Sequence, residues 1–249
     1  MTWVTLDRNP LGAPVQISRT VVQRIRNGVA GRAKGNAREA APCGKCTDTW
    51  GRVTLQSWAD RFGYDLDLRT ELLDPCRPPA WSKVVLLRQR LKTHRIALWV
   101  DADAIVVDGS TDLSLEVTSR RPIAMVAHEY SGQRVPNTGV IALRSCATTR
   151  TLLDRLWNMT EYIHHPWWEN AALLDLLGYD IRREPIAKVR ASPLDDRIVW
   201  LDKAWNSIDL DPAAHPFVKH YPGMPFERRL AGMRSDLATV SPAQADDHR

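Results

Sequence analysis

Two aspartates interrupt an apolar run in the middle of the chain. Asp101 and Asp103 follow the letters ALWV and precede AIVV, so their carboxylates lie at the end of a buried strand. Unpaired charges are costly there, and two neighbouring carboxylates repel each other unless a cation lies beside them. Mg²⁺ and Mn²⁺ bind carboxylate oxygens and usually complete their coordination with substrate phosphates. The turn therefore indicates a divalent-metal site for a phosphorylated ligand, and the small Ala102 lets the backbone approach that ligand closely.

Two classes of enzyme use such a turn, and a third, non-enzymatic reading is also open. One class is the metal-dependent nucleotide-sugar transferase, and the other is the haloacid-dehalogenase-like phosphatase, which also needs a lysine and an acidic pair. Asp195 and Asp196, with Lys188 or Lys203, are candidates for those groups. The phosphatase nucleophile normally follows the first strand of its domain, whereas at least one strand and two helices are predicted before the strand that leads into this turn. The third alternative is a non-catalytic module that binds nucleotide sugars or nucleic acid.

The turn must be positioned by the elements around it, and strands and helices alternate along the chain. Apolar periodicity predicts strands over 3–6, 64–68, 95–100, 123–129 and 138–144, and helices over 52–63, 81–94, 148–159 and 167–178. This alternation predicts an α/β fold in which helices flank a mostly parallel central sheet. We expect a single domain over 1–230, with a mobile or inserted segment over 19–49 and a polar tail over 231–249.

Composition narrows the possible partners. The 249 residues carry 34 Lys and Arg against 29 Asp and Glu, and this formal charge of +5 favours phosphate-bearing ligands only weakly. The densest basic stretch, 19–38, has no interleaved aromatic residues, so nucleic acid is not an expected partner. No apolar run reaches about 18 residues and the start lacks a signal-like core, which predicts a cytoplasmic protein. Cys43 and Cys46 are expected to be reduced thiols, because no further metal ligands are spaced around them.

Four patterns occur in order between residues 80 and 227: AWSKVVLLRQRLKTHRIALWVDADAIVVD, NTGVIALRSCATTRTLLDRLW, WWENAALLDLL and FVKHYPGMPFE. Together they resemble the galactosyl/xylosyl/mannosyltransferase family, glycosyltransferase family 34. In that family a helix with Lys or Arg leads into a tryptophan-rich strand and an Asp-x-Asp-Ala turn. The resemblance implies a GT-A (Rossmann-like) fold and transfer of a hexose or pentose from a nucleotide sugar, UDP-linked by preference, to a hydroxyl acceptor. It also implies a Mn²⁺ or Mg²⁺ cofactor.

The resemblance assigns three metal ligands, Asp101, Asp103 and His220. Neutral imidazole is a suitable partner for carboxylates around Mn²⁺. It assigns the nucleotide sugar to Thr5, Leu6, Lys83, Arg88, Asp101, Ala102, Asp103, Gly223 and Arg228. Arg88 is expected to reach a phosphate or the acidic turn. The lysine that follows the family's His-x-x-Gly motif is replaced here by Pro225, so Arg228 or Arg229 is expected to neutralise the leaving diphosphate.

The sugar and the acceptor are assigned to Asn137, Thr138, Gly139, Trp168 and Trp205. The family's acidic-acidic-Gln run is altered here to Trp168-Glu169-Asn170. We expect Glu169 to contact the sugar or assist catalysis, and Asn170 to face the anomeric carbon. The family retains the configuration of the anomeric carbon, and the altered run leaves that outcome open. Eukaryotic members carry a membrane anchor that is missing here, so the chain looks like a compact bacterial form.

Overall fold

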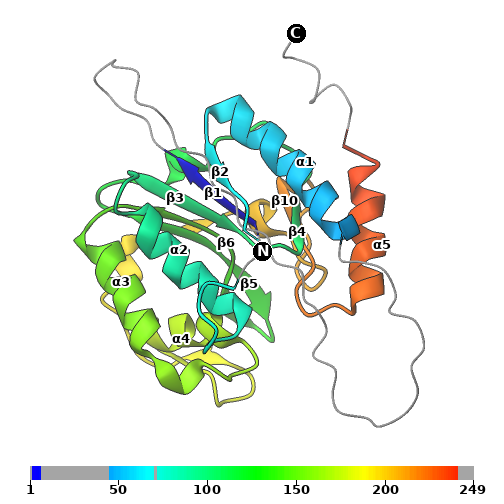
Figure 1. Cartoon of the computed structure of the whole chain (residues 1–249). Coiled ribbons are helices and arrows are strands. Elements are labelled where there is room, and N and C mark those ends of the chain that lie inside the picture. The colour runs from blue at the N-terminus through cyan, green and yellow to red at the C-terminus, as the bar shows by residue number, and fades with distance from the viewer. Residues whose placement is uncertain (1, 7–44, 70–71, 241–249) are drawn as a thin grey trace.

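A six-stranded sheet forms the centre of the fold in the computed structural model, which describes residues 2–6, 45–69 and 72–240 (Figure 1). The strands are β1 (Thr2–Leu6), β2 (Asp65–Asp67), β3 (Ile96–Val100), β4 (Ala104–Val106), β5 (Ile123–Tyr130), β6 (Gln133–Arg144), β7 (Tyr179–Asp180), β8 (Ala187–Lys188), β9 (Ile198–Leu201) and β10 (Val218–His220). The helices are α1 (Lys45–Phe62), α2 (Ser82–Arg90), α3 (Ala147–Asn158), α4 (Trp168–Leu176) and α5 (Phe226–Leu237).

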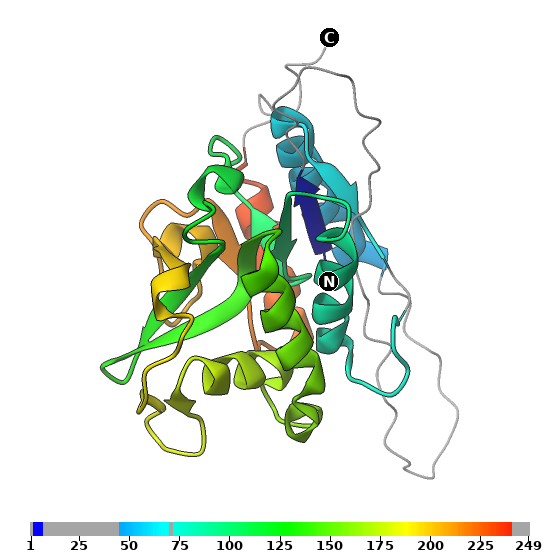
Figure 2. The same ribbon diagram turned by 90° about the vertical axis from the view of Figure 1, so that its left-hand side faces the viewer.

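The central sheet is mixed, with the strand order β2-β1-β3-β6-β5-β9. Among its described strands only β5 and β9 run parallel, so the prediction of a mostly parallel sheet was wrong. A tight turn at Ser131 and Gly132, both with positive φ, folds β5 back onto β6 as a hairpin. This hairpin projects beyond the rest of the sheet (Figure 2).

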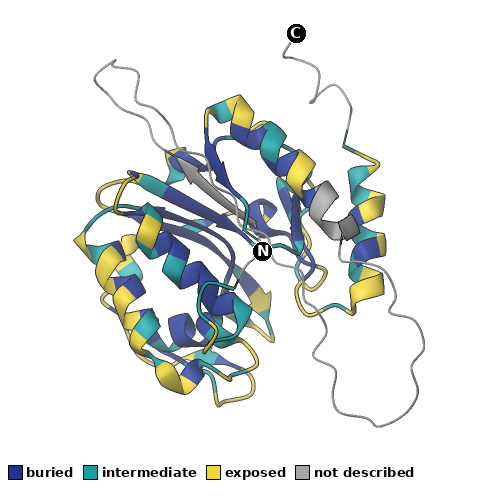
Figure 3. Ribbon diagram, in the orientation of Figure 1, coloured by how far each residue is buried: buried dark blue, intermediate teal, exposed yellow. Residues whose placement is uncertain are grey.

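Both faces of the sheet are buried, which explains the continuous apolar runs that suggested parallel strands. Ala97 and Trp99 of β3 pack into a cluster with α2, α3 and α4. Leu98 and Val100 point the other way, into a cluster with α1, β4 and β10. Most of the described residues of β2, β3, β5 and β6 are buried, while exposed residues lie on the outer sides of the helices (Figure 3). Because burial on both faces gives the same sequence pattern for either strand direction, the pattern did not determine the pairing.

Two predicted boundaries differ from the structure. Helix α1 begins at Lys45, within the segment 19–49 that we expected to be mobile or inserted, while residues 7–44 lie outside the described part of the chain. Helix α5 continues to Leu237, so the predicted tail from 231 was wrong over its first turns. Met233 of α5 is buried, and Asp236 pairs with Lys219 at 2.7 Å, which fixes this helix to the end of β10.

None of the helices in the described ranges is both long and apolar enough to span a membrane. The cysteines that the structure describes in full, Cys76 and Cys146, are free thiols. Cys43 lies outside the described residues, and the side chain of Cys46 is not described.

Candidate functional site

The Asp101–Asp103 turn connects the central sheet to the small two-stranded sheet of β4 and β10. Strand β3 ends at Val100, and the Asp101 amide donates to the Gly139 carbonyl at 2.7 Å. Strand β4 then pairs with β10 so that Ala104 lies opposite His220. The pairing of β10 with β4 therefore brings a residue from far along the chain to the acidic turn.

Three side chains predicted as metal ligands converge at this turn. One ligand atom from each of Asp101, Asp103 and His220 lies within 4.8 Å of the other two. His220 Nε2 is 3.4 Å from Asp103 Oδ1 and 3.8 Å from Asp101 Oδ2. Carboxylate oxygens with one imidazole nitrogen form a donor set suited to Mn²⁺, and also to other divalent ions of the first transition row.

An asparagine that the sequence analysis missed orients His220. The His220 Nδ1 lies 2.8 Å from Asn206 Oδ1, and Asn206 Nδ2 donates to Asn137 Oδ1 at 2.9 Å. With Nδ1–H donated to Asn206, a neutral His220 aims the lone pair of Nε2 at the two carboxylates. A lone pair facing carboxylate oxygens needs a cation between them, and a metal-ligating histidine held by a second hydrogen bond is the usual arrangement. No pattern in the sequence marked Asn206.

Gly139 supports the same histidine by its lack of a side chain. A Cβ atom at this position would lie 2.3 Å from His220 Cε1 and 2.4 Å from Nδ1. The Gly139 amide also donates to Asn137 Oδ1 at 2.7 Å. The structure therefore places Gly139 against the histidine, and Asn137 behind it, hydrogen-bonded to both Asn206 and Gly139.

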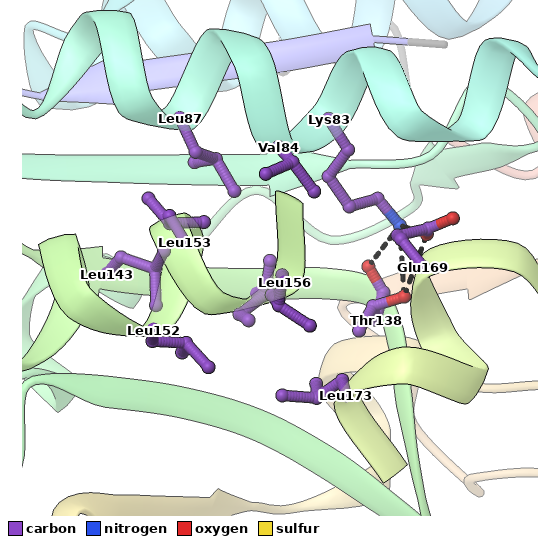
Figure 4. Close-up of a pocket in the computed structure, with 11 residues that line it drawn as sticks. Lys83, Val84, Leu87, Thr138, Leu143, Leu152, Leu153, Leu156, Glu169 and Leu173 are labelled. Atoms are coloured by element: carbon purple, nitrogen blue, oxygen red, sulfur yellow. Dashed lines mark hydrogen bonds and ion pairs between the residues drawn. The ribbon is translucent and has the colours of Figure 1, made fainter. Parts of the chain in front are cut away.

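Lys83 of α2 is buried between the turn and the start of α4. Its Nζ lies 3.2 Å from Asp101 Oδ1, 2.7 Å from Glu169 Oε1 and 3.0 Å from both Thr138 Oγ1 and the Thr138 carbonyl. Burial alone would lower the pKa of Lys83, but the carboxylates of Asp101 and Glu169 more than reverse this and raise it. Figure 4 shows Lys83 pointing at Glu169 and Thr138, at one end of a pocket whose other walls are mostly leucines.

Two arginines of α5 were candidates for the diphosphate, and only one lies at the site. Arg229 Nη1 is 3.1 Å from Asp103 Oδ2. Burial would raise the pKa of Asp103, but His220, when its imidazole carries a proton, and then the charge of Arg229 outweigh it and lower that pKa. Arg228 is 72% exposed and pairs with Asp209 at 3.4 Å. The assignment of Arg228 is therefore corrected to Arg229, because successive helical residues face different directions.

Arg88 does not reach the acidic turn. Its guanidinium pairs with Asp154 of α3 at 2.7 Å, where Arg88 is partly exposed and Asp154 is exposed. Lys83 and Arg88 lie on the same helix, but a helix turns by about 100° per residue, so their spacing puts them on different faces. The expectation that Arg88 contacts the turn was wrong.

Glu169 and Asn170, at the start of α4, lie beside β6. Asn170 Oδ1 accepts from the Thr138 amide at 2.9 Å, so this side chain binds the backbone. Glu169 is 5% exposed, and its Oε2 atom is buried with no partner among the described residues. Burial raises the pKa of Glu169 and Asp101 adds to this, against the opposing effect of Lys83. Glu169 therefore has one free oxygen at the site, whereas Asn170 already has a structural role.

Of the two tryptophans assigned to the sugar, Trp205 packs into the interior and Trp168 is half-buried. Trp205 is 4% exposed, and its ring centroid lies 6.1 Å from that of Trp58 and 4.7 Å from that of Phe217. Its predicted stacking on a sugar was wrong, because its apolar surface is already covered. Trp168 is half-buried, packs against the core on the α4 side of the sheet and has a positive φ of 44°.

Three further residues were predicted to bind the nucleotide sugar: Gly223, Thr5 and Leu6. Gly223, with φ of +69°, is exposed in the turn between β10 and α5. Thr5 pairs with Ala97 and Leu6 with Ile96, because β1 and β3 are antiparallel. This places both residues at the end of β3 opposite to Asp101, so the structure does not bring them to the site. Their side chains are not described.

Three solved structures are similar to this one. A glycosyltransferase involved in the glycosylation of the major capsid of PBCV-1 matches over 78% of this chain and 95% of its own, with a TM-score of 0.58 and 13% identity. The galactosyltransferase LgtC, solved with donor and acceptor sugar analogues, matches over 70% and 76%, with a TM-score of 0.45 and 10% identity. The glycosyltransferase GlyE of Streptococcus pneumoniae TIGR4 matches over 79% and 55%, with a TM-score of 0.43 and 14% identity.

No family model and no curated protein match the chain. The structural similarity to the PBCV-1 glycosyltransferase extends over most of both chains, and at such low identity it concerns the fold. The helices on both faces of the mixed sheet and the acidic turn at the end of β3 agree with it. The chain has the GT-A fold of glycosyltransferases, as predicted.

Proposed function

We propose that this chain is a metal-dependent glycosyltransferase that transfers a sugar from a nucleotide-sugar donor to a hydroxyl acceptor. The observation that carries the proposal is the convergence of Asp101, Asp103 and His220 within 4.8 Å at the end of a central strand. We take Mn²⁺ or Mg²⁺ as the metal and a UDP-sugar as the preferred donor, following the resemblance to glycosyltransferase family 34. Transfer with retention is proposed on the same basis.

Such a reaction requires above all that the enzyme stabilise negative charge, because this charge develops on the departing nucleoside diphosphate. The bound metal would supply a Lewis acid for this charge. Arg229 lies beside Asp103, and its remaining N–H groups would donate to diphosphate oxygens. Donors fixed before the reaction stabilise the developing charge without reorganisation.

Glu169 is the residue we propose for contact with the donor sugar. Its Oε2 atom is buried and unpartnered among the described residues, and a buried carboxylate oxygen is stabilised by a hydroxyl that donates to it. Lys83 holds the other carboxylate oxygen at 2.7 Å and so fixes the direction of Oε2. Asn170 would act indirectly, by tying the start of α4 to β6.

The phosphatase alternative loses support from the positions of its candidate residues. Lys188 pairs with Asp195 near the surface, and Lys203 pairs with Asp211 at 2.7 Å. No contact links either lysine to Asp101 in the described structure. The constellation that a phosphatase of this type needs is therefore not assembled around the turn.

Thermal unfolding with UDP or GDP, each with and without Mn²⁺, tests the proposal. We expect a nucleoside diphosphate to raise the Tm only when Mn²⁺ is present, because Asp101, Asp103 and His220 would hold the metal, and the metal would supply the positive charge that the phosphates need. No response to either diphosphate would contradict the proposal.

Two other outcomes would support the alternatives. Stabilisation by a nucleoside diphosphate without any hydrolysis or transfer of a donor would support a binding module. Phosphate release from p-nitrophenyl phosphate that is abolished in Asp101→Asn would support the phosphatase.

His220 has a test of its own. Replacing it by alanine removes one ligand, so His220→Ala should raise the Mn²⁺ concentration needed for the Tm shift by about tenfold or more. An unchanged Mn²⁺ titration would show that His220 is not a ligand. Arg228→Ala is the matched control, because Arg228 is exposed and pairs with Asp209 away from the turn.

A further inference from the structure

The two aspartates of the turn share one arrangement: each presents one oxygen to His220 and the other to a cation. Asp101 Oδ2 and Asp103 Oδ1 are the oxygens near His220 Nε2, at 3.8 and 3.4 Å. On the outer side, Asp103 Oδ2 receives Arg229 at 3.1 Å. Asp101 Oδ1 receives Lys83 Nζ at 3.2 Å, and also the indole N–H of Trp99. The inner oxygens face the candidate metal position, while the outer ones are occupied.

Unlike Arg229, Lys83 is held in place by burial and by several polar contacts, so it cannot move away from Asp101. It is 3% exposed, and its ammonium is surrounded by Asp101, Glu169 and both oxygens of Thr138. It also lies 4.8 Å from the centroid of the Trp99 ring, within the range of a cation–π contact. An ammonium group has no N–H donor to spare in such surroundings. Lys83 could contact a donor phosphate only by abandoning buried carboxylates, which is costly.

We propose that Lys83 is a positioning residue that restricts Asp101 to binding a cation through a single oxygen, and that this restriction favours a small octahedral cation over Ca²⁺. The inference rests on the proposed function, since it concerns the same metal site. It changes the role assigned to Lys83 from direct contact with the nucleotide sugar to control of the first metal ligand.

The selectivity follows from how the cations bind carboxylates. Ca²⁺ takes about 6–8 oxygen ligands and often binds a carboxylate through both oxygens. Mg²⁺ requires a near-octahedral shell at about 2.0–2.1 Å, to which each carboxylate gives one oxygen. With Asp101 Oδ1 occupied by Lys83 and Trp99, the two-oxygen mode at Asp101 is blocked. The wild-type site is therefore expected to prefer Mn²⁺ or Mg²⁺ to Ca²⁺.

The test compares Mn²⁺ and Ca²⁺ binding by titration calorimetry on the full chain, with the metal salts alone. The informative variant is Lys83→Met combined with Glu169→Gln, so that no buried carboxylate is left unpaired, and Glu169→Gln alone is its reference. Freeing Asp101 Oδ1 should reduce the Mn²⁺-over-Ca²⁺ preference by about tenfold or more, the size typical of losses in outer-shell partners. Arg88→Met, on the same helix and away from the turn, should leave the preference unchanged.

A second variant keeps the inference testable if the double variant does not fold. Lys83→Gln alone, with Glu169 unchanged, removes the ammonium from Asp101 Oδ1 and should shift the preference in the same direction. An unchanged Mn²⁺-to-Ca²⁺ ratio in either folded Lys83 variant would overturn the inference. Absence of metal binding by the wild-type chain would contradict the proposed function itself, so the two failures are distinguishable.

Discussion

At the scale of single residues, the candidate site depends on side chains that are tightly packed and held by hydrogen bonds. His220 has its Nδ1 atom on Asn206 and its ring against Gly139, so its Nε2 atom has one direction available. A histidine whose second ring nitrogen is held by such a hydrogen bond has the fixed ring orientation that is usual for a metal ligand. We therefore predict that small steric changes near His220 affect metal binding.

Gly139→Ala tests this prediction. The new Cβ would meet the His220 ring at 2.3 Å, so either the ring or the strand must shift. We expect a loss of about 1–3 kcal/mol in the free energy of unfolding from overpacking, with Mn²⁺ affinity lowered by about tenfold or more. Gly51→Ala is the control, since its Cβ would make only a 3.5 Å contact. Equal Mn²⁺ affinity in Gly139→Ala and the wild type would contradict the role of this packing.

His128 gives a prediction for the pH dependence of stability. Burial lowers its pKa below 6.5, more than the neighbouring Asp211 raises it. As pH falls through 6.5, the unfolded chain therefore binds a proton at His128 before the folded chain does, and the folded state is destabilised. Urea unfolding between pH 7.5 and 5.5 should show a shallower loss of stability in His128→Gln than in the wild type. Identical pH slopes would contradict this.

At the scale of elements, the pairing of β10 with β4 and the packing of α5 complete the site. Helix α5 supplies Arg229, and its later turns are fixed by Met233 in the interior and by the Lys219–Asp236 ion pair. The sequence predicted a tail from 231 because the stretch is polar on average. This stretch has few apolar positions. The burial of Met233 results from the packing of α5 against β4 and β10, which the local sequence does not show.

Helix α5 should accordingly contribute to the stability of the folded domain. Met233→Ala removes a side chain that is 1% exposed and should lower the free energy of unfolding by about 2–5 kcal/mol. Ser235→Ala, at an exposed position of the same helix, should change it by less than about 0.5 kcal/mol. Urea unfolding measures both, and equal stabilities of the two variants would show that α5 is not packed as described.

At the scale of the whole molecule, the sequence predicted the GT-A fold and the three side chains that converge at the acidic turn, but not the strand directions. The acidic turn was recognisable because Asp101 and Asp103 interrupt an apolar run, and His220 because its flanking motif resembles a family. Thr5, Leu6 and Arg88 were misplaced because the sequence does not show that β1 is antiparallel or which helix face points inward. Asn206 and the burial of Trp205 depend on contacts between distant segments, which no local pattern records.

The release of free nucleoside diphosphate from a panel of nucleotide sugars, with and without Mn²⁺, tests the central claim most directly. We predict Mn²⁺-dependent release from at least one donor, with UDP-sugars as the preferred donors. Release should fall by about 100-fold or more in Asp103→Asn, because electrostatic stabilisation of the leaving diphosphate is lost. Release that is independent of the metal and unchanged in Asp103→Asn, or no release from any donor, would contradict a metal-dependent glycosyltransferase.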